Sequence, residues 1–156
     1  MSKSLARVRA ALADAGLTVE LREMDASTRT AEDAAAAVGC ALDQIVKSIV
    51  FRGEDTGHVR LFLTAGGNRI CPDKAARAAG EPLGRADATL VRAKTGFAIG
   101  GVAPLGHLTP IPCWADPRLR DFETVWAAAG TPRHVFAIAP DTLLRVTGAR
   151  LADFTA

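Results

Sequence analysis

The run Ile45-Val-Lys-Ser-Ile-Val-Phe51 limits the possible folds of this chain more than any other segment. It is apolar almost throughout and rich in β-branched residues, which is typical of a buried β-strand. Residues 53–57 supply turn chemistry, and residues 58–64 then alternate between apolar and polar. The sequence therefore predicts a β-hairpin over residues 45–64.

Helical and strand patterns alternate along the rest of the chain. Helices are expected at residues 3–15, 30–39, 72–79, 87–95 and 140–147, and strands at 18–24, at the start of 97–107, at 111–115, 124–129 and 135–139, and after 148. Thr30 with Asp33 resembles a capping box, and Asp43 is expected to cap a short turn. Because hairpins occur beside crossovers, the pattern predicts one α/β domain over residues 1–156 with a mixed sheet.

Composition narrows the functional classes. The 156 residues carry 19 basic and 17 acidic side chains, so a net charge of +2 is too small for general nucleic-acid binding, and any RNA contact must be local. The N-terminus shows no secretory signal and no apolar run reaches membrane-spanning length, so we expect a cytoplasmic protein without membrane contact. The three cysteines and three histidines lack metal-ligand spacing, so neither a metal nor another cofactor is expected.

Lys47 is the most unusual polar residue, because it interrupts the apolar run. Strand alternation places it on one face with Ile45, Ile49 and Phe51. A buried ammonium group is costly unless it is paired or its pKa falls. Lys47 is therefore a candidate functional residue, with a packed stem and a solvated head group as the alternative.

A glycine-rich segment, Gly100-Gly-Val-Ala-Pro-Leu-Gly-His107, is the second candidate. Glycines allow successive main-chain amides to point the same way and hold a carbonyl, oxyanion or phosphate, although a tight turn is the alternative. The segment lacks the spacing of a P-loop or a dinucleotide fingerprint. Thr30 fits either a helix cap or a binding residue. No serine elbow or Cys/His pair supports a protein nucleophile.

Three features in order along the chain resemble the YbaK/ProX family of aminoacyl-tRNA deacylases. They are Thr30-Ala31 at a helix start, Lys47 in QIVKSIVF, and the GGVAPLGH segment after Thr95-Gly-Phe. The resemblance covers about residues 30–147. It implies a YbaK/ProX-like domain, with a mixed, mostly antiparallel twisted sheet or barrel and flanking helices.

The resemblance also implies a reaction, which is hydrolysis of the ester that joins a wrong amino acid to the 3′ end of tRNA. The expected substrate is tRNA for proline carrying a small residue such as alanine or cysteine, and prolyl-tRNA synthetase is an expected partner. Such editing exists because a synthetase pocket discriminates weakly between small side chains.

Site residues are carried over by position. The resemblance implies that Lys47 is the essential lysine and that Gly100, Gly101, Val102, Ala103 and Pro104 form the substrate loop, with Gly100 and Gly101 in the catalytic group. It further implies that Thr30 lines the pocket and that Gly106 and His107 meet the substrate. Scattered arginines could form a phosphate track: Arg7, Arg9, Arg69, Arg92 and Arg133.

Two other classes stay open at this point. The domain could bind tRNA or a synthetase without turnover, because fold does not fix function. It could also be a phosphate- or nucleotide-binding module that uses the glycine loop. The amino acid removed, the selection of tRNA, the proton-transfer group and the oligomeric state are not determined by the sequence.

Overall fold

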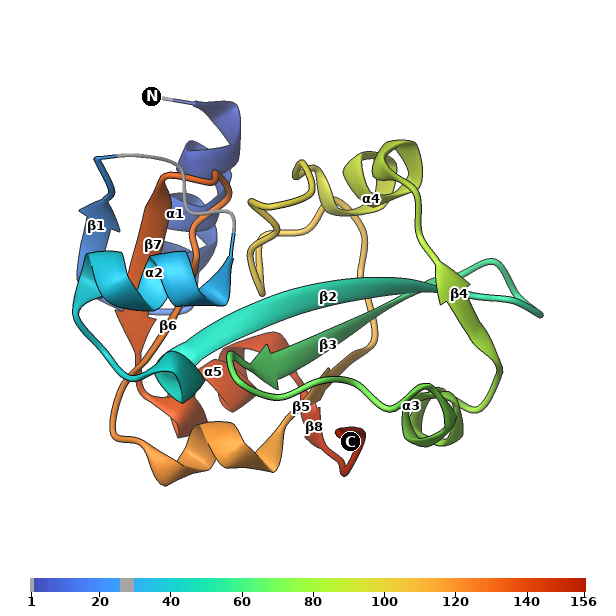
Figure 1. The fold of residues 1–156 in the computed structure, drawn as a ribbon. Coiled ribbons are helices and arrows are strands. Elements are labelled where there is room, and N and C mark those ends of the chain that lie inside the picture. The colour runs from blue at the N-terminus through green and yellow to red at the C-terminus, as the bar shows by residue number, and fades with distance from the viewer. Residues whose placement is uncertain (1, 26–29) are drawn as a thin grey trace.

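The computed structural model describes residues 2–25 and 30–156, so the predicted domain over residues 1–156 includes five residues outside the described ones. The described residues form five α-helices, two 3-10 helices and a mixed sheet of eight strands (Figure 1). The helices are α1 (Lys3–Asp14), α2 (Ala31–Val38), η1 (Leu42–Gln44), α3 (Pro72–Ala79), α4 (Ala88–Thr95), η2 (Pro117–Asp121) and α5 (Pro140–Thr147). The strands are β1 (Leu21–Glu23), β2 (Ile45–Gly53), β3 (Val59–Ala65), β4 (Leu83–Arg85), β5 (Cys113–Ala115), β6 (Val125–Ala128), β7 (His134–Ile138) and β8 (Arg150–Leu151).

The sheet runs in the order β1-β7-β6-β2-β3-β5-β8, with β4 also paired to β2. Antiparallel pairs join β2 to β3 and β4, and β7 to β1 and β6, whereas β2–β6, β3–β5 and β5–β8 are parallel. The predicted mixed sheet and the hairpin over residues 45–64 are confirmed. The hairpin register runs from Val46 opposite Ala65 to Arg52 opposite Val59.

The second edge of β2 is only partly covered. β6 pairs with Ile45 and Val46, and β4 pairs with Phe51 to Gly53. Within the described residues, no strand pairs with this edge between those two stretches. Figure 1 shows β2 as a long curved strand, with the segment after α4 lying on one side of this open stretch and α2 close to its beginning.

The two faces of β2 pack into different parts of the core. Val46 belongs to the main apolar cluster with Val8 of α1 and the fully buried Phe97. Ile45 belongs to a second cluster with Trp126 and the alanines of α2. Successive strand residues point to opposite faces, so this division shows that the alternation predicted for β2 is real.

Helix α2 begins and ends as the sequence predicts. The Thr30 hydroxyl oxygen accepts a hydrogen bond from the Asp33 amide at 3.0 Å, and Gly39 ends the helix in the left-handed conformation with φ 82°. Asp87 caps α4 in the same way, by accepting from the Leu90 amide at 2.8 Å.

The prediction for Asp43 is wrong. Ala41 is the N-cap of η1 and Asp43 lies inside that helix. The Asp43 carboxylate instead accepts from the Gly67 amide at 2.8 Å and pairs with Arg118 at 3.0 Å, so a long-range contact has replaced the local cap.

Three strand predictions also needed correction. The expected strand at Phe97 is a loop, because the Gly101 amide closes a turn onto the Ala98 carbonyl and Gly100 has φ +92°. The strand expected over residues 111–115 begins only at Cys113, since Pro112 has no amide to donate to a ladder. The strand expected over residues 18–24 is shortened to β1, the part that pairs with β7.

No helix within residues 2–25 and 30–156 is long and apolar enough to cross a membrane.

Candidate functional site

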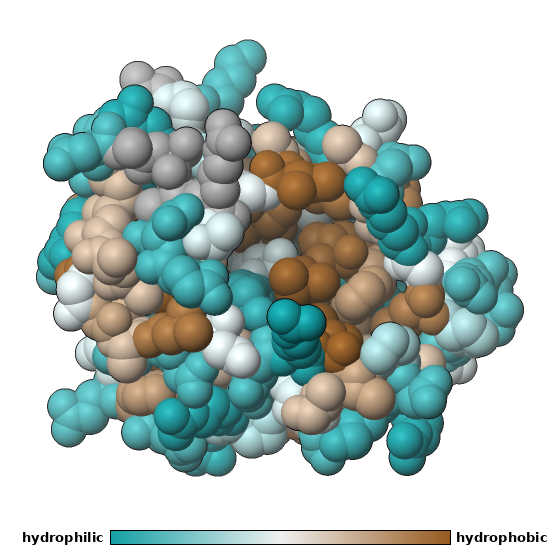
Figure 2. Space-filling model, viewed as in Figure 1, coloured by the Kyte–Doolittle hydropathy of each residue, from teal (hydrophilic) through white to brown (hydrophobic). Residues whose placement is uncertain are grey.

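The uncovered edge of β2 borders a cavity of about 620 Å³, which is within the usual range for small-ligand sites. Figure 2 shows a hollow near the centre of this face, with hydrophobic side chains along part of its rim. Its walls come from α2, β2, the turn after β3, the segment after α4, and β6 with β7. Thr30, Lys47, Gly100 and Val102, all predicted site residues, lie in these walls.

Lys47 supplies a positive charge to this cavity. Its Nζ atom donates a hydrogen bond to the main-chain carbonyl of Asn68 at 2.6 Å. Within the described residues Lys47 forms no ion pair, so this charge is not neutralised by a carboxylate. The half-buried stem beside the apolar Ile45 and Ile49 holds the ammonium group at the cavity wall.

Asp116 fixes the turn that holds Lys47. It is only 2% exposed, and its Oδ2 atom accepts from the Asn68 side-chain amide at 2.8 Å and from the Ala65 amide at 3.1 Å. Its Oδ1 atom accepts from the Arg118 amide at 3.0 Å. The buried carboxylate therefore positions Asn68, and Asn68 in turn positions Lys47.

The glycine loop contributes a second wall. Gly100 is exposed at the cavity and Val102 is buried beside it. The Gly101 amide is already bonded to Ala98 at 3.0 Å, and a Cβ atom built on Gly101 would lie 2.9 Å from the Thr131 Cα atom. Within the described residues the amides of Gly100 and Val102 have no hydrogen-bond partner, so these two amides remain available to a ligand.

The end of the loop turns away from the cavity. Ala103, Pro104, Gly106 and His107 are not among its lining residues. His107 Nε2 lies 2.7 Å from the Ala103 carbonyl oxygen, and burial lowers the pKa of its imidazole below the ordinary value. The ring also packs edge-on against Phe97, with the ring centroids 6.0 Å apart.

Thr30 lies in the cavity wall, although its hydroxyl oxygen already accepts the capping bond from Asp33. Next to it Glu32, in the first turn of α2, exposes a carboxylate at the same wall. Sequence reasoning missed Glu32, Ser48 and Asn68 as cavity residues. Glu32 and Ser48 lie near Thr30 and Lys47 in the sequence, but only Thr30 and Lys47 belong to a recognisable sequence pattern. Asn68 has no such pattern around it.

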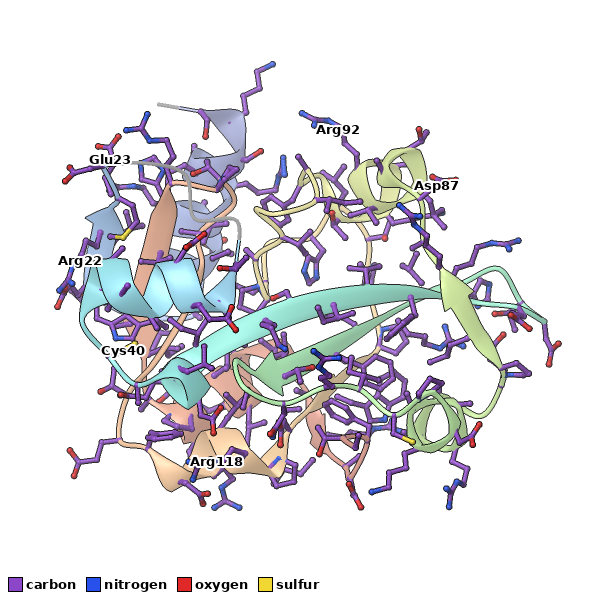
Figure 3. All side chains as sticks on the ribbon, in the orientation of Figure 1. Arg22, Glu23, Cys40, Asp87, Arg92 and Arg118 are labelled. Carbon is purple, nitrogen blue, oxygen red and sulfur yellow. The ribbon has the colours of Figure 1, made fainter. Side chains whose placement is uncertain are left out.

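The predicted phosphate track is not continuous. Arg69 lies in the cavity wall and is exposed. Arg7 donates to the Gly96 carbonyl and stacks over Phe97, and Arg133 donates to the Asp25 carbonyl at 2.8 Å. Arg92 extends from α4 away from the body of the protein (Figure 3).

In the described parts of the chain, no three His, Cys, Asp or Glu side chains form a group that could hold a metal ion. Burial raises the pKa of the Cys113 thiol to about 12, so this cysteine stays protonated and unreactive at neutral pH.

Comparison with known proteins agrees with the family suggested by the lysine strand and the glycine loop. Residues 25–146 match the family of aminoacyl-tRNA editing domains. The chain belongs to this family. The match includes β2, the glycine loop and the turn that carries Asn68, so every wall of the cavity lies within the editing domain.

The chain is also similar to individual proteins. A protein proposed to be a trans-editing enzyme for prolyl-tRNA synthetase has a crystal structure with 49% sequence identity and a TM-score of 0.93, and the match covers 100% of this chain and 99% of that one. The crystal structure of a hypothetical protein is 29% identical with a TM-score of 0.88, over 96% of this chain and 99% of that one. The uncharacterised protein YwhH of Bacillus subtilis (strain 168) is 32% identical over 124 residues, which are 80% of this chain and 78% of YwhH.

Proposed function

We propose that this protein is an aminoacyl-tRNA deacylase that hydrolyses the ester of mischarged tRNA in trans. The observation that carries the proposal is the unneutralised ammonium group of Lys47 at the wall of a cavity in a member of the editing-domain family. A water oxygen attacks the ester carbonyl carbon, the bond to the ribose oxygen breaks, and that oxygen takes up a proton. The products are the free amino acid and uncharged tRNA.

Lys47 acts as an electrostatic group in this reaction. A protonated ammonium group cannot accept a proton, so Lys47 is not the general base. Its charge instead attracts the terminal phosphate and ribose of the tRNA and stabilises negative charge that develops on the ester. Arg69, exposed at the same cavity, adds a second positive charge for the phosphate.

Main-chain amides stabilise the carbonyl oxygen. Donors that are already in place are most effective where charge develops in the transition state. Gly100 and Val102 supply unpaired amides from the cavity wall, whereas Gly101 is occupied and Pro104 has no amide hydrogen. Gly101 therefore supports the loop through its close approach to Thr131, while its neighbours contact the substrate.

The cavity wall suits an uncharged amino-acid side chain. Apolar side chains make up much of its wall, including Ile49, Val102 and Trp126. We propose tRNA for proline carrying a small wrong residue, such as alanine or cysteine, as the substrate. The relative proposed to edit for prolyl-tRNA synthetase supports this choice and supports that synthetase as a partner. A substrate used in translation implies a cytoplasmic site of action.

The test is a deacylation panel. Purified protein is incubated with tRNA for proline carrying alanine, cysteine, serine or proline, and loss of the ester is followed against a reaction without protein. The proposal predicts fast loss of alanine or cysteine and slow loss of proline. Binding of these tRNAs without any loss of ester would contradict it, and would favour a non-catalytic tRNA-binding domain.

A further inference from the structure

Ser48 follows Lys47 on β2 and lies in the wall of the same cavity. Strand alternation places its side chain on the face opposite Lys47, together with Val46 and Val50. Val46 and Val50 pack in the same apolar cluster as Val102 of the glycine loop. Lys47 and Ser48 therefore approach the cavity from the two faces of one strand edge.

The main-chain groups of Ser48 point to the uncovered edge of β2. On β3, Leu61 and Ala65 direct their amides away from β2, to the Pro112 carbonyl at 3.0 Å and to Asp116 at 3.1 Å. In an antiparallel pair, alternate residues bond to the partner strand, so Phe62 and Thr64 bond to their opposite residues Ile49 and Lys47.

Ser48 lies between those two bonding residues, so its amide and carbonyl face the other edge. At that edge β6 pairs no further than Val46 and β4 begins at Phe51. In residues 2–25 and 30–156 no strand covers the carbonyl of Ser48.

The hydroxyl of Ser48 is also without a partner. Its Oγ atom is buried, and no hydrogen bond is found for it in the described part of the chain. Buried polar groups in native proteins almost always have a partner, and leaving one unpaired is destabilising. Within the described residues, Ser48 thus has two oxygen acceptors without a partner, its edge carbonyl and its buried hydroxyl.

We propose that Ser48 is a substrate-binding residue whose carbonyl and hydroxyl oxygens accept hydrogen bonds from the α-ammonium group of the aminoacyl ester. This inference rests on the proposed function and adds a role for a residue that neither the family resemblance nor the glycine loop assigns. An ammonium group has three donors and needs several acceptors when it leaves water.

The charges around the cavity agree with a substrate whose α-ammonium group lies at Ser48. Glu32 exposes its carboxylate at the cavity from α2, and it forms no ion pair within the described residues. Lys47 and Arg69 supply positive charge at the wall formed by β2 and the turn after β3. An aminoacylated 3′ end carries a positive ammonium group on one side of its ester and a negative phosphate on the other. Ser48 therefore suits the first group, with Glu32 as a further negative charge at the cavity, and Lys47 with Arg69 suits the second.

The test compares two esters that differ only at the α-amino group. Alanyl-tRNA carries the ammonium group, and propionyl-tRNA has hydrogen in its place. Ser48→Ala is expected to lower kcat/KM for alanyl-tRNA by about 10- to 100-fold, the range expected for a hydrogen bond to a charged group. For propionyl-tRNA the same variant should remain within about threefold of the unmodified protein.

Stability supplies a second measurement. Ser48→Ala removes an unpaired buried hydroxyl, so its Tm should be equal to or higher than that of the unmodified protein. Ser48→Cys keeps the shape of the side chain with a poorer acceptor and should show the same selective loss on alanyl-tRNA. Ser4→Ala is the control, because Ser4 lies on α1 and is not part of the cavity lining. This variant should change kcat/KM for neither ester.

Two results would overturn the role of Ser48 alone. One is full activity of Ser48→Ala on alanyl-tRNA, and the other is an equal loss on both esters. If the unmodified protein hydrolyses neither ester, the proposed function and the role of Ser48 both fail.

Discussion

The Nζ atom of Lys47 lies 2.6 Å from the main-chain oxygen of Asn68, and this contact ties the strand lysine to the turn after β3. The same turn is bonded to the buried Asp116 through the Asn68 side chain. A charge that must act at one point in a cavity needs a fixed neighbour. The carboxylate therefore affects the site without lying at the cavity wall itself.

Asp116→Ala should lower both stability and activity. The change leaves the Ala65 amide and the Asn68 side chain without their buried acceptor, which costs about 1–3 kcal/mol in the free energy of unfolding. Urea unfolding measures this loss, and kcat/KM should fall because Lys47 is less well positioned. Asp121→Ala is the control, since Asp121 is an exposed partner of Arg118 and should cost less than about 1 kcal/mol. Equal effects of the two variants would contradict the role of Asp116.

Gly101→Ala should displace the glycine loop. Its new Cβ atom would lie 2.9 Å from the Thr131 Cα atom, and a main-chain neighbour cannot rotate away as a side chain can. We expect a loss of about 1–3 kcal/mol, as for overpacked sites, and a lower kcat/KM. Gly84→Ala is the matched control, because its nearest neighbour is the flexible Glu54 side chain at 3.3 Å. Wild-type stability of Gly101→Ala in urea unfolding would refute this account of the loop.

His107 should make stability depend on pH. Burial lowers its pKa in the folded protein below the ordinary value of 6.5, so the unfolded chain binds more protons just below that pH. The stabilisation from neutral His107 is present above about pH 6.5 and is lost as the pH falls toward the folded pKa.

Urea midpoints at about pH 7.5 and about pH 5.5 measure this dependence. The unmodified protein should lose more stability between these pH values than His107→Gln does. His58→Gln, at an exposed position, should behave like the unmodified protein. An identical pH response of His107→Gln and the unmodified protein would show that burial of this imidazole has no effect on stability.

Local signals in the sequence predicted much of the fold. The cap at Thr30, the turn after Phe51 and the alternation around Lys47 each act over a few residues, so they can be recognised without tertiary structure. The short strand β4 and the 3-10 helix η2 were not predicted from the sequence. β4 is three residues long, and its pairing with β2 joins residues about thirty positions apart, which no local pattern encodes.

The candidate site could be predicted only in part. Lys47 and the loop at Gly100 stand out because a lysine in an apolar strand and paired glycines are unusual locally. The role of Asn68 depends on its contact with Lys47, and that of Ser48 depends on a gap between β6 and β4 in the finished sheet. His107 was expected to meet the substrate, which remains a prediction, and in this structure it contacts the Ala103 carbonyl outside the cavity lining.

The most direct test of the central claim is the single-turnover rate of alanyl-tRNA hydrolysis by Lys47→Met. Methionine keeps much of the apolar stem and removes the charge, so packing is preserved while the electrostatic role is lost. Lys74→Met is the matched control, because Lys74 lies on α3, outside the cavity lining, where it pairs with the exposed Asp153. We predict a loss of at least about 100-fold for Lys47→Met, comparable to removal of one stabilising group from a transition state, and no change for Lys74→Met. A rate for Lys47→Met equal to that of the unmodified protein would contradict the proposed role of Lys47.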